Sequence, residues 1–162
     1  MSVETPHMDE LLRLVPTVTY GDAAAGRGGA LHLSAVLPAL SAAIGHPIST
    51  KVHTDPQACK KALGLPDATS AIVVLVDGLG YWNLAMRLGQ APYLRSLMNE
   101  SANQRPIATC APSTTVAAMA TFGTGTCPGL TGMAGYTQLE PNNHKLIKHI
   151  QIKEALAPKP LN

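Results

Sequence analysis

"SAIVVLVDGLG", Ser70 to Gly80, is the stretch from which the rest of the sequence is interpreted. Its β-branched apolar run, Ala71–Val76, predicts a strand. Because its apolar residues follow one another without alternation, the strand should be covered on both faces, as in a parallel sheet. Asp77 and Gly78 end the run as a common turn pair. Asp77 would then lie at the carboxyl edge of the sheet, where ligand-handling residues collect. Two interpretations stay open: a turn or cap carboxylate, and a metal ligand or catalytic group.

Further elements are predicted on both sides of this strand from apolar spacing and from Pro, Gly and Asp at segment ends. Before the strand we predict a helix over Ala30–Gly45, which Pro38 bends or restarts, and a helix that Asp55 and Pro56 cap and Gly64 stops. After the strand we predict one helix that follows Gly80, another from about Ala91, and a strand over Pro106–Cys110. The last predicted elements are a helix over Val116–Phe122 and a hairpin around Glu140–Asn143. The alternation of strands and helices with short connections predicts an α/β sandwich.

A cluster of hydroxyl residues precedes the helix at Val116, within "CAPSTTVAAMATFGTGTCPG", Cys110 to Gly129. Thr115 would lie at the N-terminus of that helix, where the helix dipole and backbone N–H groups favour an anion such as phosphate. Ser and Thr are also good N-caps, so a purely structural interpretation stays open. If the two predicted strands are neighbours, Asp77 and Thr115 lie side by side. A divalent cation on Asp77 could then activate the Thr115 hydroxyl as a nucleophile.

The bulk composition fits one domain and excludes several partner classes. The chain has 162 residues and a formal net charge of +2, and it lacks long basic runs, so we expect no nucleic-acid polymer as partner. The longest apolar run is too short to span a bilayer, and the N-terminus does not read as a secretory signal, so we expect no membrane association. Three cysteines without a CxxC pair argue against a disulfide framework or a zinc ribbon and favour a cytoplasmic location. Cys110 and Cys127, which flank the hydroxyl-rich stretch, are predicted to be buried small hydrophobic residues rather than reactive thiols.

Three segments together resemble a known family: "AIVVLVDGLGYWNL", "APYLRSL" and "APSTTVAAMATFGTGTCPGLTGMAGY". They resemble the N-terminal part of the alkaline-phosphatase superfamily, and within it the bacterial type I phosphodiesterase/nucleotide pyrophosphatase family. The resemblance runs over residues 70–136 and more weakly back to Ala30. It implies a partial alkaline-phosphatase-like α/β sandwich with a mostly parallel central sheet flanked by helices.

The resemblance also implies roles for four residues. Asp77 matches the strand-end metal ligand, and Thr115, the third residue after Pro112, matches the nucleophile that touches the same metal. In eukaryotic-type members an Asn near the end of the segment contacts phosphate; here the corresponding stretch is "TGMAGY". We assign Tyr136, with Thr114, to substrate binding. The implied chemistry is phosphoryl or nucleotidyl transfer from a small phosphorylated or nucleotide substrate to Thr115, then hydrolysis of the covalent intermediate.

The family's remaining ligands for two metal ions, usually zinc, are Asp and His residues that come later in longer chains. His144 and His149 are read as solvated side chains, so the second metal site is not expected here. We therefore expect residues 1–29 to be an extension, 30–150 the N-terminal half of the α/β domain, and 151–162 a tail. Two functions stay open: a truncated metal-dependent hydrolase, and a non-catalytic remnant that binds a phosphate ligand or a protein. An open sheet edge would allow self-association.

Overall fold

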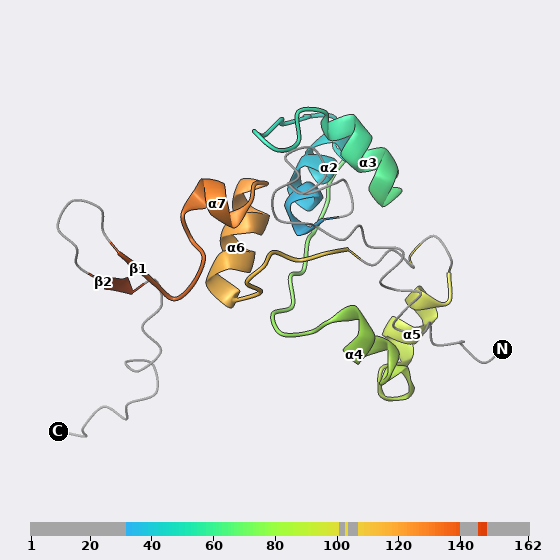
Figure 1. Cartoon of the computed structure of the whole chain (residues 1–162). Coiled ribbons are helices and arrows are strands. Elements are labelled where there is room, and N and C mark those ends of the chain that lie inside the picture. The colour runs from blue at the N-terminus through green and yellow to red at the C-terminus, as the bar shows by residue number, and fades with distance from the viewer. Residues whose placement is uncertain (1–31, 101–102, 104–106, 140–145, 149–162) are drawn as a thin grey trace, which may run out of the picture.

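The computed structural model describes residues 32–100, 103, 107–139 and 146–148, and the predicted extension and tail lie outside these ranges. The elements follow one another as η1 (Leu33–Ala35), α2 (Val36–Ala43), α3 (Pro56–Leu63), α4 (Tyr81–Ala85), η2 (Leu88–Gln90), α5 (Pro92–Met98), α6 (Thr115–Thr124), α7 (Pro128–Thr131), β1 (Thr137–Leu139) and β2 (Leu146–Lys148). Figure 1 shows α2 beside α3, with α4 and α5 grouped separately. None of the helices in the described ranges is long and apolar enough to cross a membrane.

The predicted helix over Ala30–Gly45 forms as two pieces within its described part. The 3-10 turn η1 leads into α2, and Pro38 lies in the first turn of α2. Proline is tolerated there because the first N–H groups of a helix have no partner within the helix. Pro38 therefore restarts the helix rather than bending it. α2 ends just before Gly45, which adopts a φ of 82°.

Helix α3 has the predicted ends. The Asp55 carboxylate accepts hydrogen bonds from the N–H groups of Gln57 at 3.0 Å and Ala58 at 3.1 Å. Pro56 takes the first helical position, and Gly64 ends the helix in the left-handed region with a φ of 65°. The helix packs on α2, where Ala35, Ala39 and Cys59 form a small buried cluster beside Leu63 and Leu65. Of the two cysteines predicted to be buried small hydrophobic residues, Cys110 is buried and Cys127 is only partly buried.

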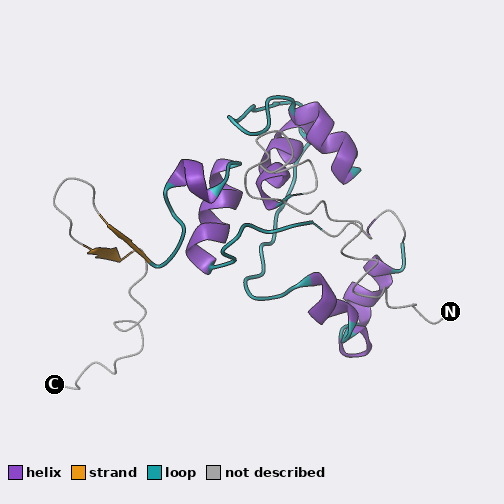
Figure 2. Ribbon diagram, in the orientation of Figure 1, coloured by secondary structure: helices purple, strands orange, loops and turns teal. Residues whose placement is uncertain are grey.

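The two predicted buried parallel strands are not formed among the described residues, so the parallel sheet is not confirmed. Ser70–Val76 forms no regular secondary structure (Figure 2), and the side chains of Ile72 and Val74 are 93% and 79% exposed. In the second predicted strand, which begins at the undescribed Pro106, Ala108 makes only an isolated parallel bridge to His32. A strand needs neighbours to satisfy its backbone and to cover its side chains. The described segments place none beside Ala71–Val76.

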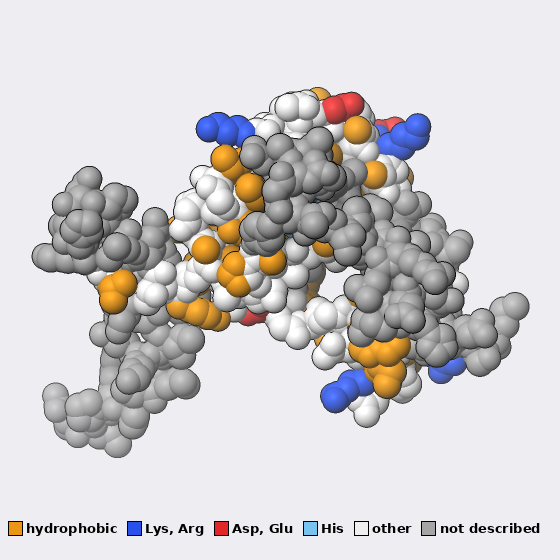
Figure 3. Space-filling view, viewed as in Figure 1, with side chains coloured by type: hydrophobic (Ala, Val, Ile, Leu, Met, Phe, Trp, Pro, Cys, Tyr) orange, Lys and Arg blue, Asp and Glu red, His pale blue; other side chains and the backbone are white. Residues whose placement is uncertain are grey.

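The exposed apolar run belongs to a wider pattern. Hydrophobic side chains reach the surface in several places (Figure 3). Besides Ile72 and Val74, large exposed side chains come from α5, from α6 and from the residue that follows α4; they include Met86, Tyr93, Leu94, Leu97 and Met119. Isolated exposed apolar residues are ordinary, whereas a continuous run such as Ala71–Val76 is not.

The predicted helices after Gly80 and from Ala91 are confirmed as α4 and α5, and the predicted hairpin is confirmed by its two strands. β1 pairs antiparallel with β2, and Thr137 faces Lys148 while Leu139 faces Leu146. The connecting residues 140–145, which include the expected turn, lie outside the described ranges.

Helix α6 ends at a glycine that both conformation and space require. Gly125 has a φ of +60°, and a Cβ built on it would lie 2.8 Å from Thr50 Cγ2, 3.2 Å from Pro38 Cγ and 3.3 Å from the Ser34 carbonyl oxygen. This close approach seats the end of α6 against η1, α2 and the loop at Thr50.

Replacing Gly125 with Ala should therefore lower the free energy of unfolding by more than the strain of a left-handed backbone conformation alone. Left-handed strain costs about 1–2 kcal/mol for a residue with a Cβ, and overpacking adds about 1–3 kcal/mol. Gly45→Ala is the matched control, because Gly45 has a φ of +82° with nothing within 4 Å of its added Cβ. Urea unfolding of both variants measures the difference. Equal losses in the two variants would show that the close approach at Gly125 has no energetic weight.

Candidate active site

Three of the four residues predicted for the site meet at one oxygen atom. The Thr115 hydroxyl donates a hydrogen bond to Asp77 Oδ2 at 2.8 Å, and the Tyr136 hydroxyl donates one to Thr115 Oγ1 at 3.1 Å. These residues come from the end of the apolar run, from the first turn of α6 and from the segment just before β1. The Thr115 oxygen thus lies between one hydrogen-bond acceptor and one donor.

The Asp77 carboxylate reaches Thr115 through the turn that the sequence predicted. Gly78, with a φ of 70°, adopts the left-handed conformation that an Asp-Gly turn uses. Asp77 does not take the position of a helix cap, because the N-cap of α4 is Gly80 and the Asp77 carboxylate accepts from Thr115. Asp77 and Tyr136 are exposed and Thr115 is half-buried, so solvent and a small solute can reach the site.

Thr114 has a different role from its neighbour. It is the N-cap of α6, and its hydroxyl oxygen accepts a hydrogen bond from the Ala117 N–H at 3.3 Å. The structural interpretation of the hydroxyl cluster therefore holds for Thr114, whereas the Thr115 hydroxyl is directed to Asp77. The predicted contact between Thr114 and substrate would have to compete with this cap.

The donor set suits a divalent cation in chemistry but is incomplete in number. A carboxylate and a hydroxyl oxygen are hard ligands, but catalytic zinc sites use three protein ligands. Within the ranges that the structure describes, no group of three or more His, Cys, Asp or Glu residues could hold a metal ion. Cys110, although close in sequence, is buried and directs its thiol to the Pro112 carbonyl at 3.5 Å. These residues do not complete a metal site alone.

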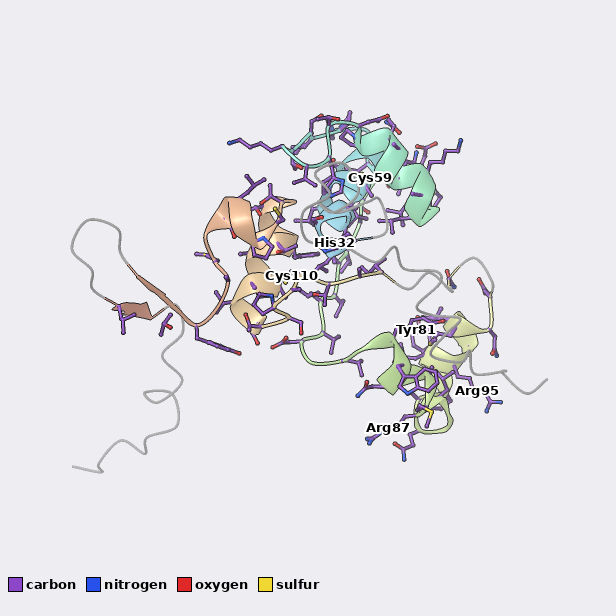
Figure 4. The ribbon with its side chains drawn as sticks, viewed as in Figure 1. His32, Cys59, Tyr81, Arg87, Arg95 and Cys110 are labelled. Atoms are coloured by element: carbon purple, nitrogen blue, oxygen red, sulfur yellow. The ribbon has the colours of Figure 1, made fainter. Side chains whose placement is uncertain are left out.

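A buried polar chain lies behind the site and was missed by sequence reasoning, which matched His32 and His53 to no motif. His32 Nδ1 lies 2.9 Å from Ser34 Oγ, and the same Oγ lies 2.8 Å from His53 Nε2. The chain continues at one end from His32 Nε2 to the Thr109 carbonyl at 3.1 Å, and at the other from His53 Nδ1 to Cys59 Sγ at 3.4 Å. Figure 4 places His32 between Cys59 and Cys110. No sequence spacing signals these contacts, because Thr109 is 77 positions from His32.

The hydrogen bonds determine the protonation of His32 and the proton shared by Ser34 and His53. A carbonyl only accepts, so His32 Nε2 carries a hydrogen, and the Ser34 N–H, 3.2 Å from Nδ1, requires a lone pair there. Both constraints fix His32 as neutral. The Ser34 hydroxyl then donates to His32 Nδ1 and accepts from His53 Nε2, and in a neutral His53 the Nδ1 atom accepts from the Cys59 thiol.

Burial favours the same neutral forms. It lowers the pKa of His32, which the hydrogen bond to the Thr109 carbonyl offsets only in part. Burial also lowers the pKa of His53, and the nearby charge of a protonated His32 lowers it further. The pKa of the Cys59 thiol is raised by burial and by the negative charge of Asp55. The chain is therefore a set of uncharged groups, each satisfied by its neighbours.

The family comparison covers the segments from which the three residues of the site come. The sequence model of the family described as type I phosphodiesterase / nucleotide pyrophosphatase matches residues 71–159. This match begins with the apolar run before Asp77 and includes Thr115 and Tyr136. No curated protein and no solved structure matched the chain.

Removing the cap hydroxyl should destabilise α6. We expect Thr114→Ala to lower the free energy of unfolding by about 1 kcal/mol, within the usual range of about 0.5–2 kcal/mol for a lost N-cap. Thr114→Ser keeps the oxygen and should stay close to the parent protein. Urea denaturation followed by circular dichroism measures both. An unchanged Thr114→Ala variant would show that the hydroxyl is not needed as a cap.

Stability should fall in acid because of the two buried imidazoles. Their folded-state pKa values lie below the ordinary 6.5, so the unfolded chain binds protons first as the pH falls. The stability they contribute is thus full above pH 6.5 and is lost progressively below it, down to the lowered folded-state pKa values. Urea unfolding across this range should show the loss. The double variant His32→Gln/His53→Gln should flatten it, whereas replacing the exposed His46 with Gln should not.

Proposed function

Because the chain belongs to the type I phosphodiesterase/nucleotide pyrophosphatase family, we propose that it acts on phosphodiester or pyrophosphate bonds with Thr115 as nucleophile. The observation that carries the proposal is the position of Thr115 Oγ1, held between the Asp77 carboxylate and the Tyr136 hydroxyl. This arrangement provides an acceptor for the proton of the nucleophile and a donor for its developing negative charge.

The proposed reaction has two steps. Thr115 Oγ1 attacks phosphorus and forms a new P–O bond, while the bond to the leaving alcohol or phosphate breaks. The Thr115 proton moves toward Asp77, along the hydrogen bond already present, and passes to the leaving oxygen or to solvent. Water then attacks the phosphothreonine, which releases phosphate or a nucleotide and restores the Thr115 hydroxyl.

Two local features support binding of a phosphate group here. α6 runs for ten residues from Thr115, so its positive dipole end lies where the phosphate would be. Tyr136 can donate its hydroxyl hydrogen either to Thr115 or to a bound oxygen. The modest net charge of the chain and its lack of basic runs favour a small phosphorylated or nucleotide substrate over a polymer.

The family is generally metal-dependent, and we propose that Asp77 and Thr115 supply two oxygen ligands to a divalent cation, by resemblance zinc. A bound cation would lower the pKa of the Thr115 hydroxyl and offset the charge of the phosphate. The further ligands, and a second ion, would have to come from groups outside the described residues. A cytoplasmic location stays a prediction from cysteine usage.

We also propose that Ala71–Val76 and Ile107–Cys110 are strands of the family's α/β sheet that gain their neighbours from further chain or from a second copy. The parallel sense of the His32–Ala108 bridge and the exposure of Ile72 support this. Self-association through the open edge of this sheet is then one way to cover the apolar run Ala71–Val76.

A second candidate function is favoured by the small number of ligands at the site. With two oxygen donors, the described site is better equipped to bind a phosphate group at α6 than to carry out hydrolysis. In this case the chain is a phosphate-binding module.

Hydrolysis of bis-p-nitrophenyl phosphate and p-nitrophenyl-TMP with added zinc or manganese tests the proposal. Thr115→Val should lower kcat by at least about a thousandfold, since it removes the nucleophile, and Asp77→Asn should lower it strongly. Tyr136→Phe should lose about 10- to 100-fold, as expected for one lost donor to a charged oxygen. Thr124→Val, which removes an exposed hydroxyl at the other end of α6, is the matched control.

The outcomes separate the two candidates. Metal-dependent turnover that survives in Thr124→Val and disappears in Thr115→Val supports the hydrolase. Absence of turnover in the folded parent chain, together with phosphate binding that Thr115→Val abolishes, supports the binding module. Turnover unaffected by Thr115→Val would contradict both.

A further inference from the structure

We propose that His32 is a positioning residue that holds the turn carrying Thr115, and that it does so as part of a largely buried polar clamp on both ends of α6. The clamp consists of His32, Ser34, His53 and Thr50 with the carbonyl groups that they bind. Its effect on catalysis rests on the proposed function, whereas its effect on the turn does not.

At the N-terminal end, two bonds fix the segment that leads into the site. His32 Nε2 donates to the Thr109 carbonyl at 3.1 Å, and the Leu33 N–H donates to the Ala108 carbonyl at 2.8 Å. The chain continues from Thr109 through the buried Cys110 to the Thr114 cap. The position of Thr115 is therefore set by where these two carbonyls are held.

At the C-terminal end, Thr50 has the corresponding role. Its hydroxyl donates to the Gly125 carbonyl at 2.8 Å and accepts from the His53 N–H at 3.0 Å. The Thr50 N–H in turn donates to the His53 carbonyl at 2.8 Å. The residue that fixes the end of α6 is thus bonded in both directions to His53.

Ser34 joins the two ends. Its hydroxyl links His32 to His53, and all three side chains are buried, with Ser34 only 1% exposed. In such surroundings a hydrogen bond is stronger than in water, and an unpaired group is costly. Each member accepts or donates only in the arrangement observed, so a shift at Thr109 would leave a buried donor without its partner.

The clamp matters for the active site because the three residues of that site come from separate segments of the chain. α6 brings Thr115, whereas Asp77 and Tyr136 arrive on loops that His32 does not touch. A misplacement of about 1 Å between reacting groups can cost on the order of 100-fold in rate. Holding the Thr109 carbonyl therefore serves the contact between Thr115 and Asp77.

Two amide variants of His32 isolate the bond to Thr109. His32→Gln places an amide N–H near the position of Nε2 and can still donate to the Thr109 carbonyl. His32→Asn places an amide oxygen near the position of Nδ1, so it still accepts from Ser34 but cannot reach Thr109. Hydrogen exchange of full-length protein, read by mass spectrometry, compares peptides over residues 107–117 with peptides over α3. The same samples are assayed with bis-p-nitrophenyl phosphate.

We expect His32→Asn to raise exchange over residues 107–117 several-fold while α3 stays protected, and His32→Gln to stay near the parent. In the assay His32→Asn should lower kcat at least tenfold with KM within about twofold. Equal exchange over residues 107–117 in the two variants would overturn the inference, and so would a rise in His32→Asn that α3 shares. An inactive parent protein would count against the proposed hydrolase alone, since exchange still decides whether His32 holds the turn.

Discussion

The hydrogen bond from His32 Nε2 to the Thr109 carbonyl is the contact on which, in our proposal, the placement of α6 and Thr115 depends. It fixes the tautomer of His32, and through Ser34 it requires a hydrogen on His53 Nε2. It also holds the segment that leads into α6. A core built around Ala35, Ala39 and Cys59 is small, so packing alone would leave this segment loosely placed. The polar chain supplies the directional contacts that small apolar side chains cannot.

The two halves of the site are supported in different ways. Thr115 follows a turn held by buried groups and begins a capped helix. Asp77 follows an irregular run whose apolar side chains face solvent, and its described anchor is the hydrogen bond to Thr115 itself. The family's α/β fold would give this run neighbouring strands on both sides. Covering the run would hold Asp77 independently of Thr115.

The sequence predicted those features that depend on near neighbours. Asp55, Pro56 and Gly64 define α3 because cap and stop act within one turn of the helix, and Asp77-Gly78 forms its turn for the same reason. The sequence did not predict the features that depend on contacts between distant segments of the chain. The run Ala71–Val76 has strand propensity, but a strand forms only against partners. The contact between Asp77 and Thr115 was expected from a shared sheet edge and is present without that sheet. The contacts that His32 makes with Thr109 and, through Ser34, with His53 produce no periodic pattern in the sequence.

The division between exposed and buried groups bears on how this site could become active. The groups proposed to meet substrate, Asp77, Thr115 and Tyr136, are accessible, whereas the His32, Ser34 and His53 side chains behind α6 are buried. A partner that covers the run before Asp77 would therefore leave the α6 side of the site as it is. It would restrict the backbone on the Asp77 side of the site, which forms no regular structure without such a partner. Completion of the site then requires ordering at one carboxylate and the arrival of further ligands, with no rearrangement of the helix that carries the hydroxyl.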